Sequence, residues 1–428
     1  MQVNLVENLL TEARQDKAQA VLNACVHCGF CTATCPTYLH TGNELDSPRG
    51  RIYLIKNMLE TGEASEVTQT HLDRCLTCQS CETTCPSGVE YHALLAIGRE
   101  TVDKLAPANR VRAASRWLIR KLMLNRPLVF GAFRIARALR ALVPAALART
   151  WLPRTRFDAD WDYPARGDQG VEQEQVRPAF TRKVLVQSGC VQPALRPDTD
   201  RALAIVLAYF GVDVEFVTGA GCCGALNSHT GDEPAARAQA LQNLSAWEAL
   251  LAAQKEAEVL AIVSSASGCG AQLADYPNLL MDDAGAQARA RTLCSLLRDP
   301  AELVWWLMEQ SPQTALPDLT GENLSFHCPC TLQHALKLSG RVEQIFARMG
   351  VSLPAVEDSH LCCGSAGSYS LLQPAMARTL RDDKLDKLLA SEPAQIITAN
   401  VGCQLHLQGG TEKPVRHWLE ILAEAMDG

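Results

Sequence analysis

The stretches CVHCGFCTATCP, residues 25–36, and CLTCQSCETTCP, residues 75–86, each carry four cysteines at the same spacing, and a proline follows the last cysteine of each. The chain has 428 residues and 18 cysteines, so it can fill the cores of two or three domains without disulfide support. Its first residues, MQVNLVENLLTEARQ, have neither the basic start nor the apolar stretch of a secretory signal. We therefore expect a cytoplasmic protein whose clustered thiols bind metal or serve in redox chemistry.

The two cysteine runs have the spacing C-x2-C-x2-C-x3-C-P, which is the ligand pattern of bacterial ferredoxins with two [4Fe–4S] clusters. Three cysteines at two-residue gaps can surround one face of a cluster, whereas the fourth is turned toward the neighbouring cluster. The alternative is a pair of structural zinc sites, but such sites rarely use three evenly spaced cysteines followed by a fourth and a proline. We predict one cluster on Cys25, Cys28, Cys31 and Cys85, and a second on Cys75, Cys78, Cys81 and Cys35.

Three regions differ in composition. Residues 1–103 hold the cysteine runs and are predicted to be mainly helical, with a helix in SPRGRIYLIKNMLETG that starts near Pro48 and ends at Gly62. Residues 104–182 are a predicted connector: 13 Lys and Arg and no Asp or Glu occur between positions 104 and 156, LVFGAFRIARALRALV has an amphipathic helical pattern, and positions 165–182 read as a linker. A short basic block in a chain of net charge −7 predicts a local contact surface and no nucleic-acid binding. No uncharged apolar run is long enough for a spanning helix.

The remainder contains an internal duplication, residues 183–310 and 311–428. In each copy one cysteine precedes a CCG motif by 32 residues, and a Gly-Cys pair follows 40 to 46 residues after that motif. Apolar stretches such as KVLVQSG, VLAIVSSAS and QIITANVG predict buried strands that lead into the cysteines, with helices such as DTDRALAIVLAYFG and MARTLRDDKLDKLLA between them. Each copy is therefore predicted to be an α/β unit, and the chain as a whole is predicted to be α+β.

The duplicated cysteines are candidate metal ligands, because four thiolates suffice for one metal ion or cluster in each copy. Three alternatives stay open: a further [4Fe–4S] cluster in at least one copy, zinc in one or both copies, or thiols without metal. Cys294 and Cys328 are left over, and His327, His334, His360 and His406 lie near the second set; each histidine alone is expected to be a hydrogen-bonded structural residue. The candidate ligands are Cys190, Cys222, Cys223 and Cys269 in the first copy, and Cys330, Cys362, Cys363 and Cys403 in the second.

The chain resembles the iron–sulfur subunits of bacterial glycolate oxidase over its whole length except for about residues 104–182. The stretches that carry the resemblance are CVHCGFCTATCPTY, LDSPRGRIYLIK, HLDRCLTCQSCETTCPSGVEYH, FHCPCTLQHALKL, DSHLCCGSAGSY and VRHWLEI. The resemblance implies a two-cluster ferredoxin-like domain followed by a duplicated CCG domain like that of heterodisulfide reductase B subunits. Those subunits continue their last cysteine as C-x-x-C, whereas here Cys269 is followed by GAQ and Cys403 by QLH. The fifth ligand of their clusters is absent, so their disulfide chemistry is not expected here.

The resemblance also implies a function, that of an electron-transfer subunit without catalytic residues of its own. FAD-containing partner subunits would oxidise glycolate to glyoxylate, and this chain would pass the electrons on, with the quinone pool as the expected acceptor. The sequence contains no nucleotide-binding fingerprint of its own, so no flavin is expected on this chain. The basic amphipathic helix would suit a peripheral contact at the inner face of the cell membrane or a contact with a partner, and a helix whose charges are paired within the chain is the alternative.

Other functions remain open at this point. Sister subunits of D-lactate and anaerobic glycerol-3-phosphate dehydrogenases share the arrangement of motifs. A stand-alone CCG-type reductase of thiols or quinones would show turnover by itself, and a zinc-stabilised scaffold would be colourless.

Overall fold

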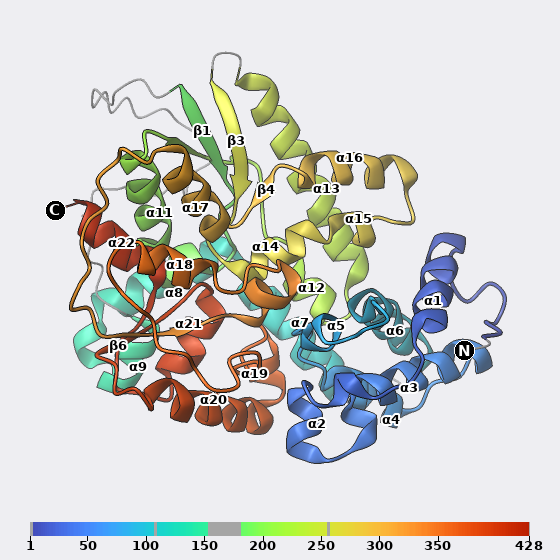
Figure 1. Ribbon diagram of the computed structural model, residues 1–428. Coiled ribbons are helices and arrows are strands. Elements are labelled where there is room, and N and C mark those ends of the chain that lie inside the picture. Colours follow the sequence, from blue (N-terminus) through green and yellow to red (C-terminus); the bar gives the residue numbers. More distant parts are fainter. Residues whose placement is uncertain (1–2, 107–108, 153–180, 255–256, 428) are drawn as a thin grey trace.

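The computed structural model describes residues 3–106, 109–152, 181–254 and 257–427 (Figure 1). In Figure 1 the N-terminal helices form one side of the molecule, and two α/β units, one green to yellow and one orange to red, form the rest. Most of the linker predicted at 165–182 lies outside the described residues. Among the helices of the described part, none combines the length and the apolar character needed to cross a bilayer.

The N-terminal region consists of helices joined by cysteine-bearing loops, so the prediction of a mainly helical region is confirmed. The predicted helix between the runs is α3 (Pro48–Thr61): the Ser47 hydroxyl accepts the Gly50 N–H at its start, and Gly62 ends it with φ +73°. The other elements of this region are α1 (Glu12–Ala24), η1 (Phe30–Thr32), α2 (Pro36–Thr41), η2 (Glu44–Asp46), α4 (Glu66–Asp73), α5 (Ser80–Thr83) and α6 (Tyr91–Leu105).

The basic connector forms α7 (Arg110–Met123), α8 (Arg126–Ala138), η3 (Arg140–Leu142) and α9 (Ala145–Trp151). Several of its arginines bind within the chain. Arg112 and Arg116 pair with Asp73 at 2.6 and 2.5 Å, and Arg137 donates to the Ala194 carbonyl at 2.7 Å. Part of the basic block therefore links α7 to the N-terminal region through ion pairs and α8 to the first α/β unit through a hydrogen bond.

The first α/β unit has a parallel sheet in the order β2-β1-β3-β4. The predicted strands KVLVQSG and VLAIVSSAS are confirmed as β1 and β3, and the predicted helix after the first cysteine is α11. The strands are β1 (Arg182–Val186), β2 (Asp213–Phe216), β3 (Glu258–Val263) and β4 (Leu297–Arg298). The helices are α10 (Gln192–Leu195), α11 (Pro197–Tyr209), α12 (Ala225–His229), α13 (Glu233–Ala253), α14 (Ser267–Ala274), α15 (Tyr276–Leu279), α16 (Ala284–Cys294) and α17 (Pro300–Gln310).

The second α/β unit repeats the plan with a smaller parallel sheet in the order β5-β6-β7. The predicted strand QIITANVG is confirmed as β6, and MARTLRDDKLDKLLA is confirmed as part of α20. The strands are β5 (Leu324–His327), β6 (Gln395–Thr398) and β7 (Val415–His417). The helices are η4 (Thr331–Ala335), α18 (Arg341–Ala347), α19 (Tyr369–Leu372), α20 (Pro374–Leu389), α21 (Val401–Gln408) and α22 (Trp418–Asp427).

The two α/β units share one hydrophobic core across the boundary predicted at 310/311. Val184 of β1, Leu203 of α11, Phe326 of β5 and Trp418 of α22 belong to the same cluster of buried residues. Burial of apolar surface from both units in one core favours a single body. The two sheets therefore hold their cysteine-bearing loops in a constant relation to each other.

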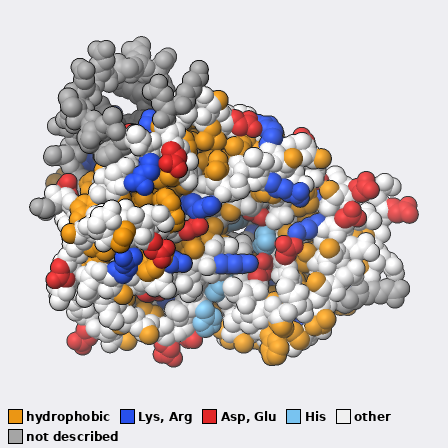
Figure 2. Space-filling model, turned by 45° about the horizontal axis from the view of Figure 1, so that its top comes forward, with side chains coloured by type: hydrophobic (Ala, Val, Ile, Leu, Met, Phe, Trp, Pro, Cys, Tyr) orange, Lys and Arg blue, Asp and Glu red, His pale blue; other side chains and the backbone are white. Residues whose placement is uncertain are grey.

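The N-terminal region packs against both α/β units through polar contacts. Arg14 pairs with Asp282 of the first unit at 2.7 Å, and Thr83 shares a 2.7 Å hydrogen bond with His334 of the second. Figure 2 shows acidic and basic side chains intermixed across the middle of one face, with histidines among them. That face has no patch of a single charge sign.

Candidate iron–sulfur and metal sites

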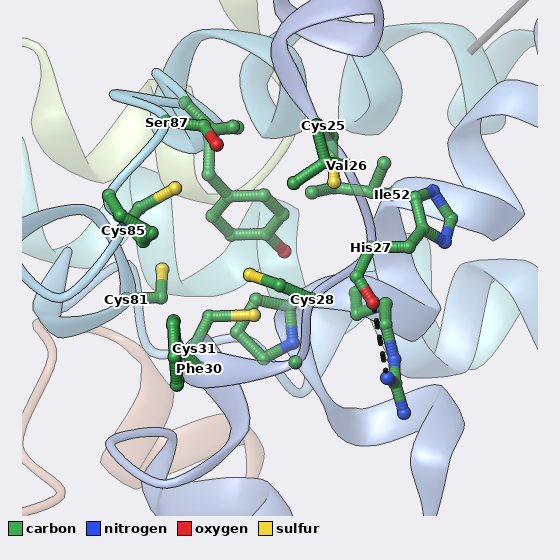
Figure 3. A pocket seen from close by; sticks show the side chains of 16 residues that line it. Cys25, Val26, His27, Cys28, Phe30, Cys31, Ile52, Cys81, Cys85 and Ser87 are labelled. Atoms are coloured by element: carbon green, nitrogen blue, oxygen red, sulfur yellow. Dashed lines mark hydrogen bonds between the residues drawn. The ribbon is translucent and has the colours of Figure 1, made fainter.

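The eight cysteines of the two runs line two adjacent pockets. Each pocket combines cysteines of one run with the last cysteine of the other. Cys81 and Tyr91 line both pockets. Figure 3 shows sulfurs from both runs around the first pocket. The first pocket is lined by Cys25, Cys28, Cys31, Cys81 and Cys85, and the second by Cys35, Cys75, Cys78 and Cys81.

The two runs adopt the same loop conformation. His27 and Gly29 of the first run have φ of +56° and +87°, and the equivalent Thr77 and Gln79 of the second have φ of +53° and +58°. Left-handed residues reverse the direction of the chain within a few positions, so cysteines two residues apart can face one side. His27 and Thr77 therefore act through their backbone conformation.

A buried arginine lies beside the second pocket. Arg51 is 1% exposed, and its Nη1 lies 3.9 Å from the Cys35 sulfur while its Nε donates to the His71 carbonyl at 2.7 Å. Arg51 also faces the buried carboxylate of Asp46 at 3.5 Å. Charge and hydrogen bonds at a cysteine sulfur tune the potential of a cluster, so Arg51 lies where it would influence a cluster bound by Cys35.

The pocket cysteines are a donor set that fits an iron–sulfur cluster. Burial raises the pKa of Cys78 and Cys81 well above the usual thiol range and that of Cys31 to about 11. A buried thiolate is costly unless a cation compensates its charge. The arrangement therefore suits thiolates bound to iron and disfavours free thiolates.

The four cysteines of the first repeat lie in one chain of contacts. Cys222 accepts hydrogen bonds from the thiols of Cys190 and Cys223, which lower its pKa, and Cys223 is hydrogen-bonded in turn to Cys269. The Gly224 N–H also points at the Cys222 sulfur at 3.5 Å. The structure thus brings together all four cysteines predicted as candidate ligands in this repeat.

The second repeat brings its four cysteines together in the same way. The sulfurs of Cys330 and Cys362 lie 3.9 Å apart, and Cys363 is hydrogen-bonded to both Cys362 and Cys403. This site also lies next to the second ferredoxin-type pocket, because Cys78 belongs to the same apolar cluster as Cys330 and Cys362. None of the four cysteines of the first repeat belongs to this apolar cluster around Cys78.

The remaining candidates separate into packing residues and one exception. His334 and His406 are hydrogen-bonded to the carbonyls of His360 and Ala377, as expected for structural histidines. Cys328 is part of the shared hydrophobic core, and the Cys294 thiol donates to the Leu273 carbonyl. His327 differs from the expectation, because its buried Nε2 has no hydrogen-bond partner in the described part of the chain.

Tyr91 is a site residue that the sequence analysis missed. Its ring lines both ferredoxin-type pockets, and it faces Cys75 and Arg51. Tyr91 follows Cys85, the last cysteine of the second run, by six residues in PSGVEYH. A tyrosine at this distance from the cysteines does not by itself indicate a binding site. Only the packing of α6 shows that Tyr91 lines the two pockets.

Comparisons with protein families agree with this division of the chain. Residues 21–89 match the family described as 4Fe-4S dicluster domain, and residues 184–274 and 324–408 each match the family described as Cysteine-rich domain. The matched ranges contain the two ferredoxin-type runs and the eight cysteines of the duplicated units.

Curated relatives extend the similarity over the full length. The chain is 44% identical over 428 residues, all of both chains, to the glycolate oxidase iron–sulfur subunit of Escherichia coli. It is 29% identical to the probable glycolate oxidase iron–sulfur subunit of Bacillus subtilis, covering 98% of this chain and 97% of that one. The lactate utilization protein A of an Exiguobacterium species is 25% identical but covers only 55% of this chain.

Proposed function

The chain belongs to the family of glycolate oxidase iron–sulfur subunits, and on that premise we propose that it relays electrons from flavin-containing subunits that oxidise glycolate to glyoxylate. The observation that carries the proposal is the pair of adjacent cysteine-lined pockets that share Cys81 and Tyr91. The membrane quinone pool is the proposed acceptor.

The proposed ligand sets are the crossed sets predicted from the spacing, with Cys85 completing the first pocket and Cys35 the second. A [4Fe–4S] cluster in each pocket would supply one-electron redox chemistry. The chain's own residues set the surroundings of that chemistry. Arg51 places a positive charge at Cys35, and the buried Tyr91 lines both pockets.

The first pocket is the proposed entry point for electrons. Its rim carries two exposed apolar side chains, Val26 at 68% and Phe30 at 61% exposure, and Cys28 is exposed as well. Exposed apolar groups at the mouth of a redox site favour a protein contact there, and electrons pass efficiently only over short distances. We propose that the flavin-containing subunit docks on this rim.

Co-purification with the flavin-containing subunits tests this function. The assembled complex should contain about eight irons for each copy of this chain in these two pockets, and should reduce a quinone analogue with glycolate. Phe30→Asp should prevent assembly while iron content stays unchanged, whereas Leu241→Asp, a change of another exposed apolar residue on α13, should leave assembly intact. Assembly of the Phe30 variant with full activity would contradict the docking site, and a complex that prefers D-lactate over glycolate would contradict the substrate.

A second part of the proposal places α7 to α9 on an anionic membrane surface. The outward side of these helices has exposed apolar residues, and exposed Lys121 and Arg134 accompany them. Lys121 shares a helical face with Trp117, Leu118 and Leu122. Basic and apolar side chains on one helical face are typical of binding to the interface of anionic bilayers. The exposed apolar residues are Val111, Trp117, Leu118, Leu122, Leu128, Ile135, Leu139, Leu142, Leu147 and Trp151.

Flotation with lipid vesicles tests the membrane contact. The intact chain should float with vesicles that contain phosphatidylglycerol and should stay unbound with vesicles of phosphatidylcholine alone. Ile135→Glu combined with Leu142→Glu should abolish flotation, and Leu241→Glu should not. Equal flotation of the double variant would overturn this part of the proposal without affecting the relay.

A further inference from the structure

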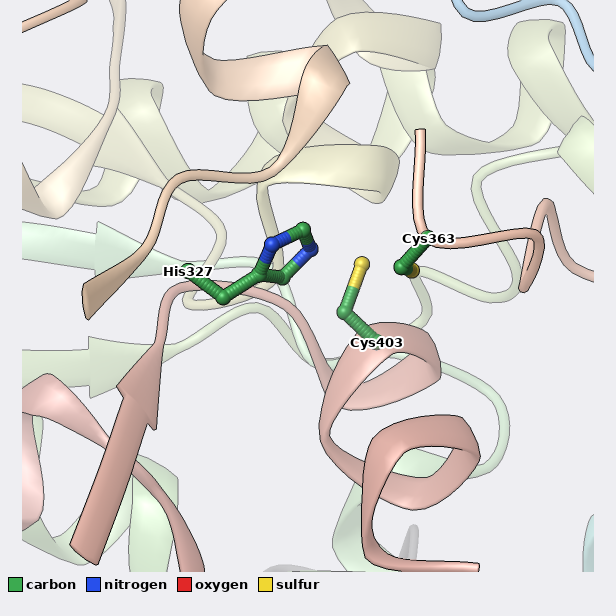
Figure 4. Close-up of side chains that lie close together, drawn as sticks. All are labelled: His327, Cys363 and Cys403. Atoms are coloured by element: carbon green, nitrogen blue, oxygen red, sulfur yellow. The ribbon is translucent and has the colours of Figure 1, made fainter. Parts of the chain in front are cut away.

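His327 is a buried imidazole without the hydrogen bonds that such a group needs. It ends β5, its side chain is 2% exposed, and its Nε2 has no partner in the described residues. A buried polar atom that lacks a hydrogen bond destabilises the folded chain. Figure 4 shows the ring pointing toward the sulfurs of Cys403 and Cys363. The unsatisfied nitrogen and the two thiols therefore lie at one place.

The spacing of these three groups suits a single metal ion. One ligand atom from each of His327, Cys363 and Cys403 lies within 4.8 Å of the other two, and no other trio of His, Cys, Asp or Glu in the described residues meets this condition. Two sulfurs bound to one zinc ion are at most about 4.6 Å apart, since each Zn–S bond is about 2.3 Å. No three cysteines of either ferredoxin-type pocket are that close together in the part that the structure describes.

The first repeat shows what the same position does without an imidazole. Gln187 precedes Cys190 by three residues, as His327 precedes Cys330. Its side chain is fully used, because it donates to the Gly221 carbonyl at 2.8 Å and accepts the indole N–H of Trp247 at 2.9 Å. The two repeats thus differ at this position between a satisfied amide and an unsatisfied imidazole.

We propose that His327, Cys363 and Cys403 bind one zinc ion. Cys362 lies outside this trio: it is hydrogen-bonded to Cys363, and its sulfur accepts the Gly364 N–H at 3.4 Å. Asn400 donates to the Cys403 sulfur at 3.4 Å, which orients this ligand from the start of α21. Zinc has no redox chemistry, so the site holds loops together beside the second ferredoxin-type pocket and does not extend the relay.

Metal content and X-ray absorption of the intact chain test this inference, and neither depends on glycolate oxidation. Purified protein with its iron loaded should contain one zinc, whose absorption spectrum shows both nitrogen and sulfur ligands. His327→Gln, which copies the first repeat, should weaken zinc binding by about tenfold or more in competition with a chelator. His406→Gln is the matched control, because a glutamine can still donate to the Ala377 carbonyl, and it should keep the zinc.

Each other outcome overturns the assignment. A zinc shell of sulfur alone, or unchanged zinc affinity in His327→Gln, would remove His327 from the site. Four additional irons in place of zinc would replace the single ion by a cluster. If His327→Gln fails to fold, the absorption spectrum of the unsubstituted chain still decides between nitrogen and sulfur ligation. None of these outcomes bears on the two ferredoxin-type pockets.

Discussion

The first and second cysteine-rich repeats carry the same four cysteines, yet their surroundings differ. In the first repeat Gln187 closes a hydrogen-bonded network with Trp247 and Gly221. In the second, His327 is buried, its Nε2 has no hydrogen-bond partner among the residues that the structure describes, and its ring points at two thiols. Both repeats have four cysteine sulfurs as candidate metal donors. Only the second repeat adds an imidazole nitrogen, because His327 stands where the first repeat has Gln187.

The two repeats also meet the N-terminal region differently. The contact with the first repeat is ionic: Arg14 pairs with Asp282, and His92 with Asp275 at 3.2 Å. The contact with the second repeat includes an apolar cluster around Cys78 and Cys330. Among the described residues, only the second repeat therefore has its cysteines next to a pocket proposed to hold a cluster.

The largest expected difference between the repeats is in metal content. Cys363→Ser should remove the zinc completely, because a hydroxyl does not replace a thiolate ligand. Cys223→Ser, at the equivalent position of the first repeat, should keep it. Elemental analysis of both variants decides; equal zinc loss in both would mean that the repeats do not differ in the way proposed.

The next effect is on stability and concerns the first repeat. Gln187→Leu leaves the buried Trp247 indole N–H and the Gly221 carbonyl without partners, which should lower the free energy of unfolding by about 1–3 kcal/mol. Urea unfolding followed by tryptophan fluorescence measures the change. A Gln187→Glu variant keeps the acceptor for Trp247 and serves as a partial control; a loss as large as that of the leucine variant would argue against the indole contact.

A smaller effect is expected at the ionic contact with the first repeat. Asp282→Asn removes the charge that faces Arg14, while Arg14 keeps Glu100 at 2.5 Å. We expect a loss of about 1–2 kcal/mol that shrinks at high salt. Glu248→Gln breaks an exposed pair with Arg289 and should cost less than about 1 kcal/mol. Equal losses would show that the contact between the regions contributes no more than a surface pair.

The smallest effect is the dependence of stability on pH in the core that the repeats share. Burial lowers the pKa of His417 to about 3, so the imidazole is neutral in the folded chain, whereas in the unfolded chain it binds a proton near pH 6.5. The contribution of His417 to the free energy of unfolding is therefore fully present above pH 6.5. It is lost as the pH falls toward 3, at up to about 1.4 kcal/mol per pH unit. Unfolding at pH 7.5 and 6.0 should show a smaller pH effect in His417→Gln. An unchanged slope would contradict the assignment.

Much of the site could be predicted because its information is local. The spacing of eight cysteines predicted the grouping around two pockets, since a two-residue gap places sulfurs on one side of a loop that turns at residues such as His27 and Thr77. The helix at 48–61 was predictable from Ser47, Pro48 and Gly62, whose side chains or backbone freedom act within a few residues. The strands β1, β3 and β6 were visible as apolar runs.

Other features depend on residues far apart in the sequence. Arg51 reads as part of a helix start, and only the packing of α3 against the second run places its guanidinium beside Cys35. The arginines of α7 belong to the basic block that was predicted to be a local contact surface, but Arg112 and Arg116 pair with Asp73 across the fold. Such pairings carry no local signal, because any of the chain's acidic residues could have been the partner.

The sequence by itself determined the candidate donor atoms of this protein: eight cysteines in ferredoxin spacing, four more in each repeat, and the alternation of strands and helices that presents them. The tertiary structure alone decided how these donors are grouped and what surrounds them. It brought Tyr91 between two pockets, set Cys78 beside Cys330, and turned His327 toward Cys363 and Cys403 while Gln187 bonded elsewhere. Spacing along a chain constrains distances over a few residues, whereas packing of the shared core fixes distances between segments hundreds of residues apart.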